Sequence, residues 1–293
     1  MGFFERMQVA NPGQDLPHKP VFIIGAPRSG STLLYQSLIT SLDFSYLSNL
    51  HCLMFGMPWL IEKMFHPSNH FKGSQFQSRR GTVRGWNSPS ECAEFWYRFF
   101  PRHPHHITRE NADPHKMKVL RNAIHALTRA SSKPLLIKNL HCSMRLQPLA
   151  DTLPEALFIV LHRKETDTAH SILAARKNQL GSYNRWFSVE PPNIEQLKQL
   201  PPQQQALEQV RSIYQQIRED ELSIGSNRFY HLQYETFCKK PRFELQDIID
   251  FLKDHGIDIN KEQALPDHFE RRTKIRIDKA LYDQLIQYAQ KGF

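Results

Sequence analysis

The chain has 293 residues, of which 40% are hydrophobic, and a net charge of +9 at pH 7. This composition suits a globular protein with a sizeable core, and no apolar stretch approaches the roughly 18 residues that cross a bilayer. The N-terminal segment lacks the apolar run of a signal peptide and the four cysteines form no Cys-x-x-Cys pair, so we expect a reduced, cytoplasmic protein with an anionic partner.

The first predicted elements are a strand, a glycine loop and a helix. The apolar run at residues 21–24 has the β-branched content of a buried strand and exits into Gly25. Leucines and serines at helical spacing predict a helix over residues 31–42. Residues 43–118 are rich in aromatic residues and interrupted by prolines, which indicates short helices and loops able to line a cleft.

Strand and helix patterns alternate through the rest of the chain. We predict strands at residues 135–137, 156–161 and 228–233, and helices at 118–130, 166–177, 204–220 and 243–253, with a Pro- and Gln-rich surface connection at 189–205. This alternation predicts the α/β class, as a single three-layer domain whose central, mostly parallel sheet is flanked by helices, like P-loop NTPases.

The glycine loop has an altered phosphate-binding frame. Gly25 and Gly30 are spaced as in a Walker A loop, whose backbone N–H groups hold phosphate oxygens at a helix N-terminus. Ser31 stands where an NTPase has lysine, and Arg28 supplies a cation inside the loop. An NTPase also needs a strand ending in Asp to help hold Mg²⁺, but the strand at 156–161 exits into His-Arg. A nucleotide kinase or NTPase with a divergent loop, or a plain tight turn, stays an alternative.

This loop resembles that of the sulfotransferases that use 3′-phosphoadenosine-5′-phosphosulfate (PAPS), a superfamily that most of the chain is similar to. The match PRSGST implies that the 5′-phosphate and the sulfuryl group are bound by Pro27, Arg28, Ser29, Gly30, Ser31 and Thr32. The resemblance thus implies PAPS as the donor, 3′,5′-phosphoadenosine as the product and no metal.

A second match concerns the 3′-phosphate. In this superfamily an Arg at a strand end and a Ser eight residues later bind that group, and Arg163 and Ser171 have this spacing. The resemblance implies that both bind the 3′-phosphate, with Arg176 assisting from the same helix. Tyr234 begins a segment similar to the one in which a family tyrosine lies near the adenine; an ordinary core tyrosine is the alternative.

The expected reaction is an in-line displacement in which an acceptor hydroxyl or amine attacks sulfur. It needs a base for the acceptor proton and cations for the charge on the bridging oxygen. Arg28 suits the second task, as does Lys138, which resembles the strand-end lysine of tyrosylprotein sulfotransferases. Glu91 is the first candidate base, on its resemblance to heparan-type sulfotransferases, followed by Glu94 and by His51.

Other features leave alternatives open. The histidines at residues 103, 105, 106 and 115 lack the spacing of a defined metal site, and the basic cluster at residues 271–276 suits either nucleotide phosphates or solvent. Nucleic-acid binding fits the charge but no recognised module. We expect one sulfotransferase domain over residues 1–293, with a P-loop part (19–42), an acceptor-side part (43–118), a 3′-phosphate part (135–177) and a C-terminal part (228–293). Its acceptor could be a small molecule, sugar, lipid or peptide.

Overall fold

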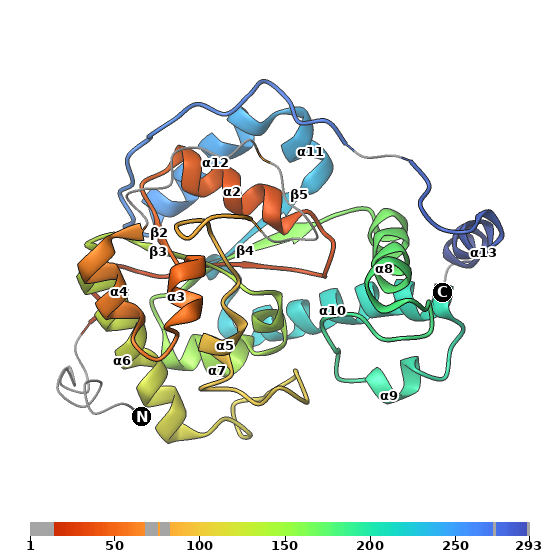
Figure 1. Ribbon diagram of the computed structural model, residues 1–293, viewed down its shortest axis with the longest axis horizontal. Helices are drawn as coiled ribbons and strands as arrows, with labels where there is room; N and C mark the ends of the chain where they lie inside the picture. Colours follow the sequence, from red (N-terminus) through yellow and green to blue (C-terminus); the bar gives the residue numbers. More distant parts are fainter. Residues whose placement is uncertain (1–14, 68–75, 77–82, 272–273, 292–293) are drawn as a thin grey trace.

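A five-stranded sheet forms the centre of the computed structural model, which describes residues 15–67, 76, 83–271 and 274–291 (Figure 1). The strand order is β2-β3-β1-β4-β5, and all four pairings between these strands are parallel. The strands are β1 (Val21–Ile24), β2 (Ser45–Tyr46), β3 (Leu135–Lys138), β4 (Leu157–His162) and β5 (Phe229–Gln233).

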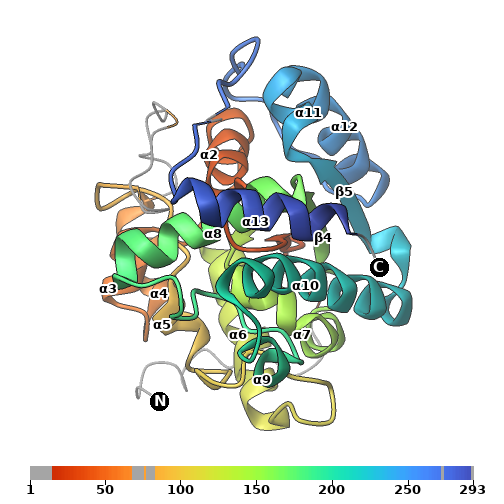
Figure 2. The ribbon, with the colours of Figure 1, turned by 90° about the vertical axis from the view of Figure 1, so that its right-hand side faces the viewer.

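Helices cover both faces of this sheet (Figures 1 and 2). One face carries α2 (Ser31–Ser41), α11 (Tyr234–Lys239) and α12 (Pro241–Asp254); the other carries α6 (Pro114–Ser131), α7 (Leu146–Thr152), α8 (Glu165–Leu180) and α10 (Pro202–Ile224). The remaining helices are α3 (Asn49–Leu53), α4 (Pro58–Phe65), α5 (Ala93–Trp96), α9 (Ile194–Leu197) and α13 (Lys279–Gln290).

The residues of β1 divide between the two layers of core. Val21 and Ile23 pack with α2 and α12, whereas Phe22 and Ile24 pack with the helices of the opposite face, and all four are fully buried. Successive side chains of a strand point to opposite faces, so a strand that is buried on both faces reads as a continuous apolar run. The predicted three-layer α/β architecture is therefore confirmed.

The strand order creates a crevice at the carboxyl end of β1. After β1 the chain crosses to the β2 edge and returns to β3, which lies on one side of β1, before it adds β4 and β5 on the other side. In open parallel sheets, ligands bind where the direction of strand addition reverses, outside the carboxyl ends of the strands. The loop that follows β1 lies at this point.

Several elements of the structure were not predicted, including the helices α7 and α11. The two-residue strand β2 forms at the sheet edge, α13 closes the described chain, and the predicted connection at 189–205 contains the single-turn helix α9. Among the described residues, no helix combines the length and the apolar character that crossing a membrane requires.

Candidate active site

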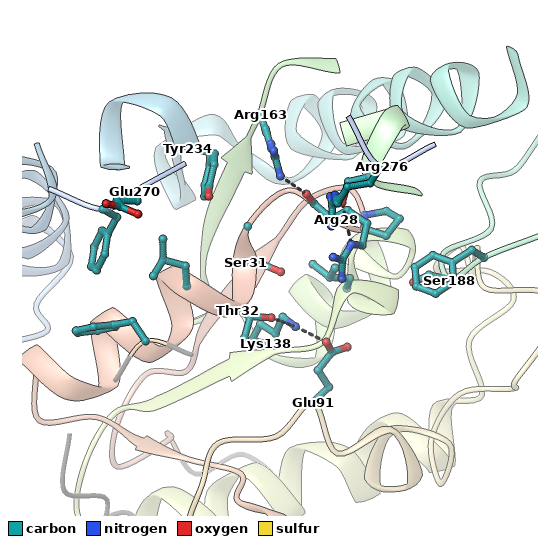
Figure 3. Close-up of a pocket in the computed structure, with 18 residues that line it drawn as sticks. Arg28, Ser31, Thr32, Glu91, Lys138, Arg163, Ser188, Tyr234, Glu270 and Arg276 are labelled. Carbon is teal, nitrogen blue, oxygen red and sulfur yellow. Dashed lines mark hydrogen bonds and ion pairs between the residues drawn. The ribbon is translucent and has the colours of Figure 1, made fainter. Parts of the chain in front are cut away.

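A cavity of about 410 Å³ opens at the carboxyl ends of four parallel strands (Figure 3). The loop after β1 forms its floor, Lys138 ends β3, Arg163 follows β4 and Tyr234 follows β5; all of these line the cavity. Four cations line it, Arg28, Lys138, Arg163 and Arg276, against the carboxylates of Glu91 and Glu270. The lining among the described residues is therefore cationic, which suits a ligand with several negative charges.

The glycine loop delivers the N-terminus of α2 to this cavity. Gly30 precedes the helix with a φ of 97°, and no side chain caps the helix by hydrogen bonding. No acidic residue occupies the first turn either. The first N–H groups of a helix lack intrahelical acceptors and carry the positive end of its dipole, so this end can bind an anion. Arg28 has a left-handed φ of 68°, a strained conformation for a residue with a Cβ.

Two guanidinium groups donate to one serine at the far side of the loop. Arg28 Nε lies 3.1 Å from Ser171 Oγ, and Arg276 Nη2 lies 3.3 Å from the same oxygen. Arg163 Nη1 donates to the backbone carbonyl of Arg28 at 3.1 Å, while its Nε is buried without a hydrogen-bond partner among the described residues. A buried donor of this kind is costly unless it is paired. The cluster of three guanidinium groups and a hydroxyl therefore fits a phosphate group.

Tyr234 forms one wall of the cavity. The Arg163 guanidinium lies over its ring at 4.8 Å from the centroid. Gly30 also lies against this ring, so close that a Cβ added there would come within 2.3 Å of two ring carbons. Burial, first among several causes, raises the pKa of the Tyr234 hydroxyl to about 12, so it is protonated at neutral pH. The ring is a fixed apolar surface between a cation and the loop.

A lysine and a carboxylate face each other at the other end of the cavity (Figure 3). Lys138, which is 4% exposed, donates to Thr32 Oγ1 at 3.3 Å and forms an ion pair with Glu91. Asn139 Nδ2 donates to the backbone carbonyl of Glu91 at 3.1 Å, which fixes the segment that carries the carboxylate. The Glu91 side chain remains 43% exposed, so it can meet a molecule that enters from solvent.

Several predicted site residues lie away from the cavity lining. His51 is fully buried, where its Nδ1 accepts from the backbone N–H of Ser48 and its Nε2 lies 3.3 Å from the Glu62 carboxylate. Glu94 is exposed and pairs with Arg102 at 2.9 Å. Arg176 is buried against Gln205 and Gln209, and the buried Ser29 does not contribute to the lining. In this arrangement the side chains of His51, Glu94 and Arg176 contact other protein groups outside the cavity lining.

Other lining residues were not singled out from the sequence. Phe187 and Ser188 come from the loop after α8, and Phe269 and Glu270 from the chain that leads to α13. No sequence pattern marked these positions. Arg276 was included only within the basic cluster at 271–276, of which residues 272 and 273 lie outside the described part.

In the histidine-rich segment, where the sequence predicts no metal site, two histidines lie close to a glutamate. Atoms of His103, His105 and Glu190 that could serve as ligands lie within 4.8 Å of one another. His105 Nδ1 accepts from the backbone N–H of Glu190 at 2.9 Å, and His103 Nδ1 lies 2.9 Å from the Glu190 carboxylate. Both Nδ1 atoms thus have protein partners. The ring of His105 also stacks on His141 at 4.2 Å.

The stacked His105 and His141 predict a loss of stability in mild acid. Burial lowers the pKa of His105 to about 3, with a contribution from the nearby His141, and burial lowers that of His141 to about 4. The unfolded chain titrates near 6.5 and therefore binds more protons below that pH, so stability is fully present above pH 6.5 and falls toward pH 4. We expect the free energy of unfolding to decrease by about 2 to 3 kcal/mol between pH 6.5 and pH 5.

Denaturant unfolding at several pH values measures this loss. The slope of the unfolding free energy against pH reports how many more protons the unfolded chain binds. His141→Gln should reduce this number by about one, whereas His115→Gln, at an exposed position, should leave it unchanged. A free energy of unfolding that stays constant from pH 6.5 to pH 5 would contradict the assignment.

Comparison with known proteins identifies the family to which this chain belongs. A family model described as "Sulfotransferase family" matches residues 20–255. The omega-hydroxy-beta-dihydromenaquinone-9 sulfotransferases Stf3 of Mycobacterium bovis and Mycobacterium tuberculosis are each 21% identical over 275 residues, which covers 87% of this chain and 68% of theirs. The crystal structure of sulfotransferase STF9 from Mycobacterium avium, 14% identical, superposes with a TM-score of 0.54 and covers 94% of this chain and 68% of that one. Because the family model spans most of the chain, this protein belongs to the sulfotransferase family and is a sulfotransferase enzyme.

Proposed function

We propose that this protein transfers a sulfuryl group from PAPS to a hydroxyl or amine of an acceptor. The observation that carries the proposal is the cationic cavity, in which Arg28, Arg163 and Arg276 gather around Ser171 while Lys138 and Glu91 face each other at the opposite end. This arrangement offers two separate phosphate sites and, beside one of them, an acid–base pair.

Each end of the cavity has a role in this proposal. Residues 27–32 would hold the 5′-phosphate and the sulfuryl oxygens through the loop backbone and the α2 N-terminus. Arg163 and Ser171, together with Arg276, would hold the 3′-phosphate, which supplies the missing partner of the buried Arg163 Nε. The ring of Tyr234 would lie beside the adenine. ATP has no 3′-phosphate, so this cluster favours PAPS.

When bound, PAPS would supply the sulfuryl group, with 3′,5′-phosphoadenosine as the leaving group. Glu91 would accept the acceptor's proton as the new oxygen–sulfur or nitrogen–sulfur bond forms. Lys138 and Arg28 would stabilise the electron pair that remains on the bridging oxygen of the leaving phosphate. The Lys138–Glu91 ion pair keeps both side chains at the mouth of the loop before an acceptor enters. Among the three candidate bases, Glu91 lines the cavity and His51 and Glu94 do not.

We also propose that the reaction is independent of metal. Of the two carboxylates that line the cavity, Glu91 pairs with Lys138, and Arg163 stands just beyond β4 where an NTPase would provide a metal ligand. Hard divalent cations require oxygen ligands, and this set of residues is mainly cationic. The kinase and nucleic-acid alternatives are not favoured, since the chain is a sulfotransferase.

The acceptor is proposed to be a lipid-like molecule. The two mycobacterial relatives are named for a menaquinone derivative that bears a hydroxyl group. Of the described residues in the part of the chain expected on the acceptor side (43–118), Phe76 and Glu91 line the cavity, so this part would meet the acceptor there. The chain is proposed to be one domain whose P-loop, 3′-phosphate and C-terminal parts all reach this cavity, through Arg28, Arg163 and Arg276 respectively.

The donor is tested by thermal stabilisation with 3′,5′-phosphoadenosine and with Mg-ATP. We expect stabilisation by the first and little by the second. Arg163→Ala should raise the dissociation constant for 3′,5′-phosphoadenosine by about 10- to 100-fold, since charge-assisted hydrogen bonds contribute about 1.5–3 kcal/mol. Its neighbour Lys164 is exposed and outside the cavity lining. Lys164→Ala removes one positive charge, as Arg163→Ala does, and this control variant should bind 3′,5′-phosphoadenosine normally. Stabilisation by Mg-ATP alone would refute the proposal.

A further inference from the structure

Exposed apolar side chains are concentrated in a few neighbouring segments of the chain. Of nine large hydrophobic residues that the described part of the chain exposes, six fall on α3, α4, the connection between them and the segment just before Glu91: Leu53, Met54, Phe55, Met64, Phe65 and Trp86, which we call the apolar patch. Leu53, Met64 and Trp86 are each more than 60% exposed. Exposed hydrophobic residues are normally scattered singly over a protein surface. A concentration of them therefore indicates an interaction surface.

The segments that carry the patch are joined to one another. The Leu50 N–H donates to the Trp86 carbonyl at 2.9 Å, which attaches the Trp86 segment to α3. Met57, at the start of α4, donates to the Met54 carbonyl at 2.9 Å. The two helices lie side by side in both ribbon views (Figures 1 and 2). The six residues therefore lie on adjoining segments, formed by two short helices, their connection and a loop.

The charged residues around this region favour an anionic partner. Lys63 and Arg84 are exposed beside Met64 and Trp86. The carboxylates of the same segments are engaged, because Glu62 is buried beside His51, and Glu94 pairs with Arg102. Apolar residues that include tryptophan, with cations at their margin, match the acyl chains and the anionic headgroups of a bilayer surface. The protein as a whole also has a charge of +9.

Hydrogen bonds connect α3, which carries part of the patch, to the segment that carries the proposed catalytic base. Ser90, next to Glu91, donates its N–H to the Leu47 carbonyl at 2.8 Å and accepts from the Cys52 thiol at 3.1 Å. Cys52 lies on α3, beside the exposed Leu53. A molecule that contacts the patch is thus held next to the segment that presents the Glu91 carboxylate to the cavity.

We propose that the apolar patch docks on an anionic lipid bilayer, so that the enzyme takes a lipid acceptor directly from the membrane surface. This inference rests on the proposed function, of which it specifies the source of the acceptor. Leu53, Met54, Met64 and Trp86 enter the interfacial region, and Lys63 and Arg84 contact headgroups. The interaction is peripheral and adds to the acceptor's own binding in the cavity.

The test measures binding of the full chain to vesicles of phosphatidylcholine with and without phosphatidylglycerol. We expect binding to the anionic vesicles and a blue shift of tryptophan emission. Leu53→Gln with Met64→Gln should lower the partition coefficient about tenfold or more, since each buried methylene group contributes substantially to insertion. The matched control is Leu222→Gln with Phe243→Gln, which removes two apolar residues that are 85% and 62% exposed elsewhere and should bind as the parent does.

Trp86 provides a direct readout of the orientation. Brominated lipids should quench the emission of the parent protein, and Trp86→Phe should still bind vesicles but lose part of that quenching, because Trp86 is 67% exposed whereas Trp96 is buried and Trp59 and Trp186 are only partly exposed. Absence of vesicle binding, equal losses in the patch and control variants, or a stable dimer that the patch variant dissociates would each overturn the proposal. Stabilisation by 3′,5′-phosphoadenosine, measured on the same samples, reports the donor site separately, so the two proposals can fail independently.

Discussion

Glu91→Gln is expected to lower kcat by about 10²- to 10⁴-fold while the affinity for 3′,5′-phosphoadenosine changes little. The glutamine keeps the shape of the side chain but cannot accept the acceptor's proton in the transition state. Among the described carboxylates, Glu91 combines a place in the cavity lining with a contact to Lys138. Its loss should therefore affect the chemical step, and not the binding of the donor at the loop.

Glu94→Gln is the matched control for this substitution. Glu94 lies three residues away, has the same side chain and pairs with Arg102 on the surface, so its replacement should leave kcat within about twofold, as for most surface changes. The measurement is the rate at which sulfated product appears, by mass spectrometry, when a lipid extract is supplied with PAPS. Unchanged turnover in Glu91→Gln would remove Glu91 from the role of base.

Substitution of Lys138 distinguishes two explanations for a low kcat in Glu91→Gln. In one explanation, the amide acts only by releasing the buried lysine from its ion pair. In that case Lys138→Met should abolish most of the activity and the double variant should be no worse. In the other explanation, Glu91 takes the acceptor's proton and Lys138 independently stabilises the leaving oxygen. The double variant should then be slower than either single variant.

The part of the cavity lining around the glycine loop could be predicted from sequence because its signals are local. The loop after β1, the exit of β4 and the first turns of α8 are each defined by a short run of residues, and parallel strands necessarily bring their carboxyl ends to one edge. Arg163 and Ser171 therefore both reach the cavity, where Arg28 connects them through two hydrogen bonds. The strand β1 and the helix α2 also begin where the apolar pattern predicted.

The parts of the fold and of the site that the sequence did not predict depend on contacts between segments that are distant in the chain. The strand β2 has two residues and no pattern of its own; it forms because Ser45 donates to the Pro134 carbonyl next to β3. In the sequence Glu91 was the first candidate base and His51 an alternative, and only the fold shows that His51 faces Glu62 in the interior. Arg276 reaches Ser171 from a chain segment that crosses the site near its C-terminal end.

Gly30→Ala is expected to lower the free energy of unfolding by about 2 to 5 kcal/mol and to abolish binding of 3′,5′-phosphoadenosine. Two causes combine at this position. The φ of 97° is unfavourable for any residue with a Cβ, and the added Cβ would come within 2.3 Å of the Tyr234 ring. The ring also contacts the Arg163 guanidinium, so moving it would change that contact as well.

Gly181→Ala isolates the first of these causes. Gly181 ends α8 with a φ of 76°, and a Cβ there would meet no atom within 4 Å, so the cost should be about 1 to 2 kcal/mol from the backbone alone. Adding Tyr234→Ala to Gly30→Ala should recover the steric part of the stability but not the binding, because the wall proposed to face the adenine is then missing. Equal unfolding free energies for the two glycine variants would show that Tyr234 does not press on the loop, and the geometry proposed for the donor site would have to be abandoned.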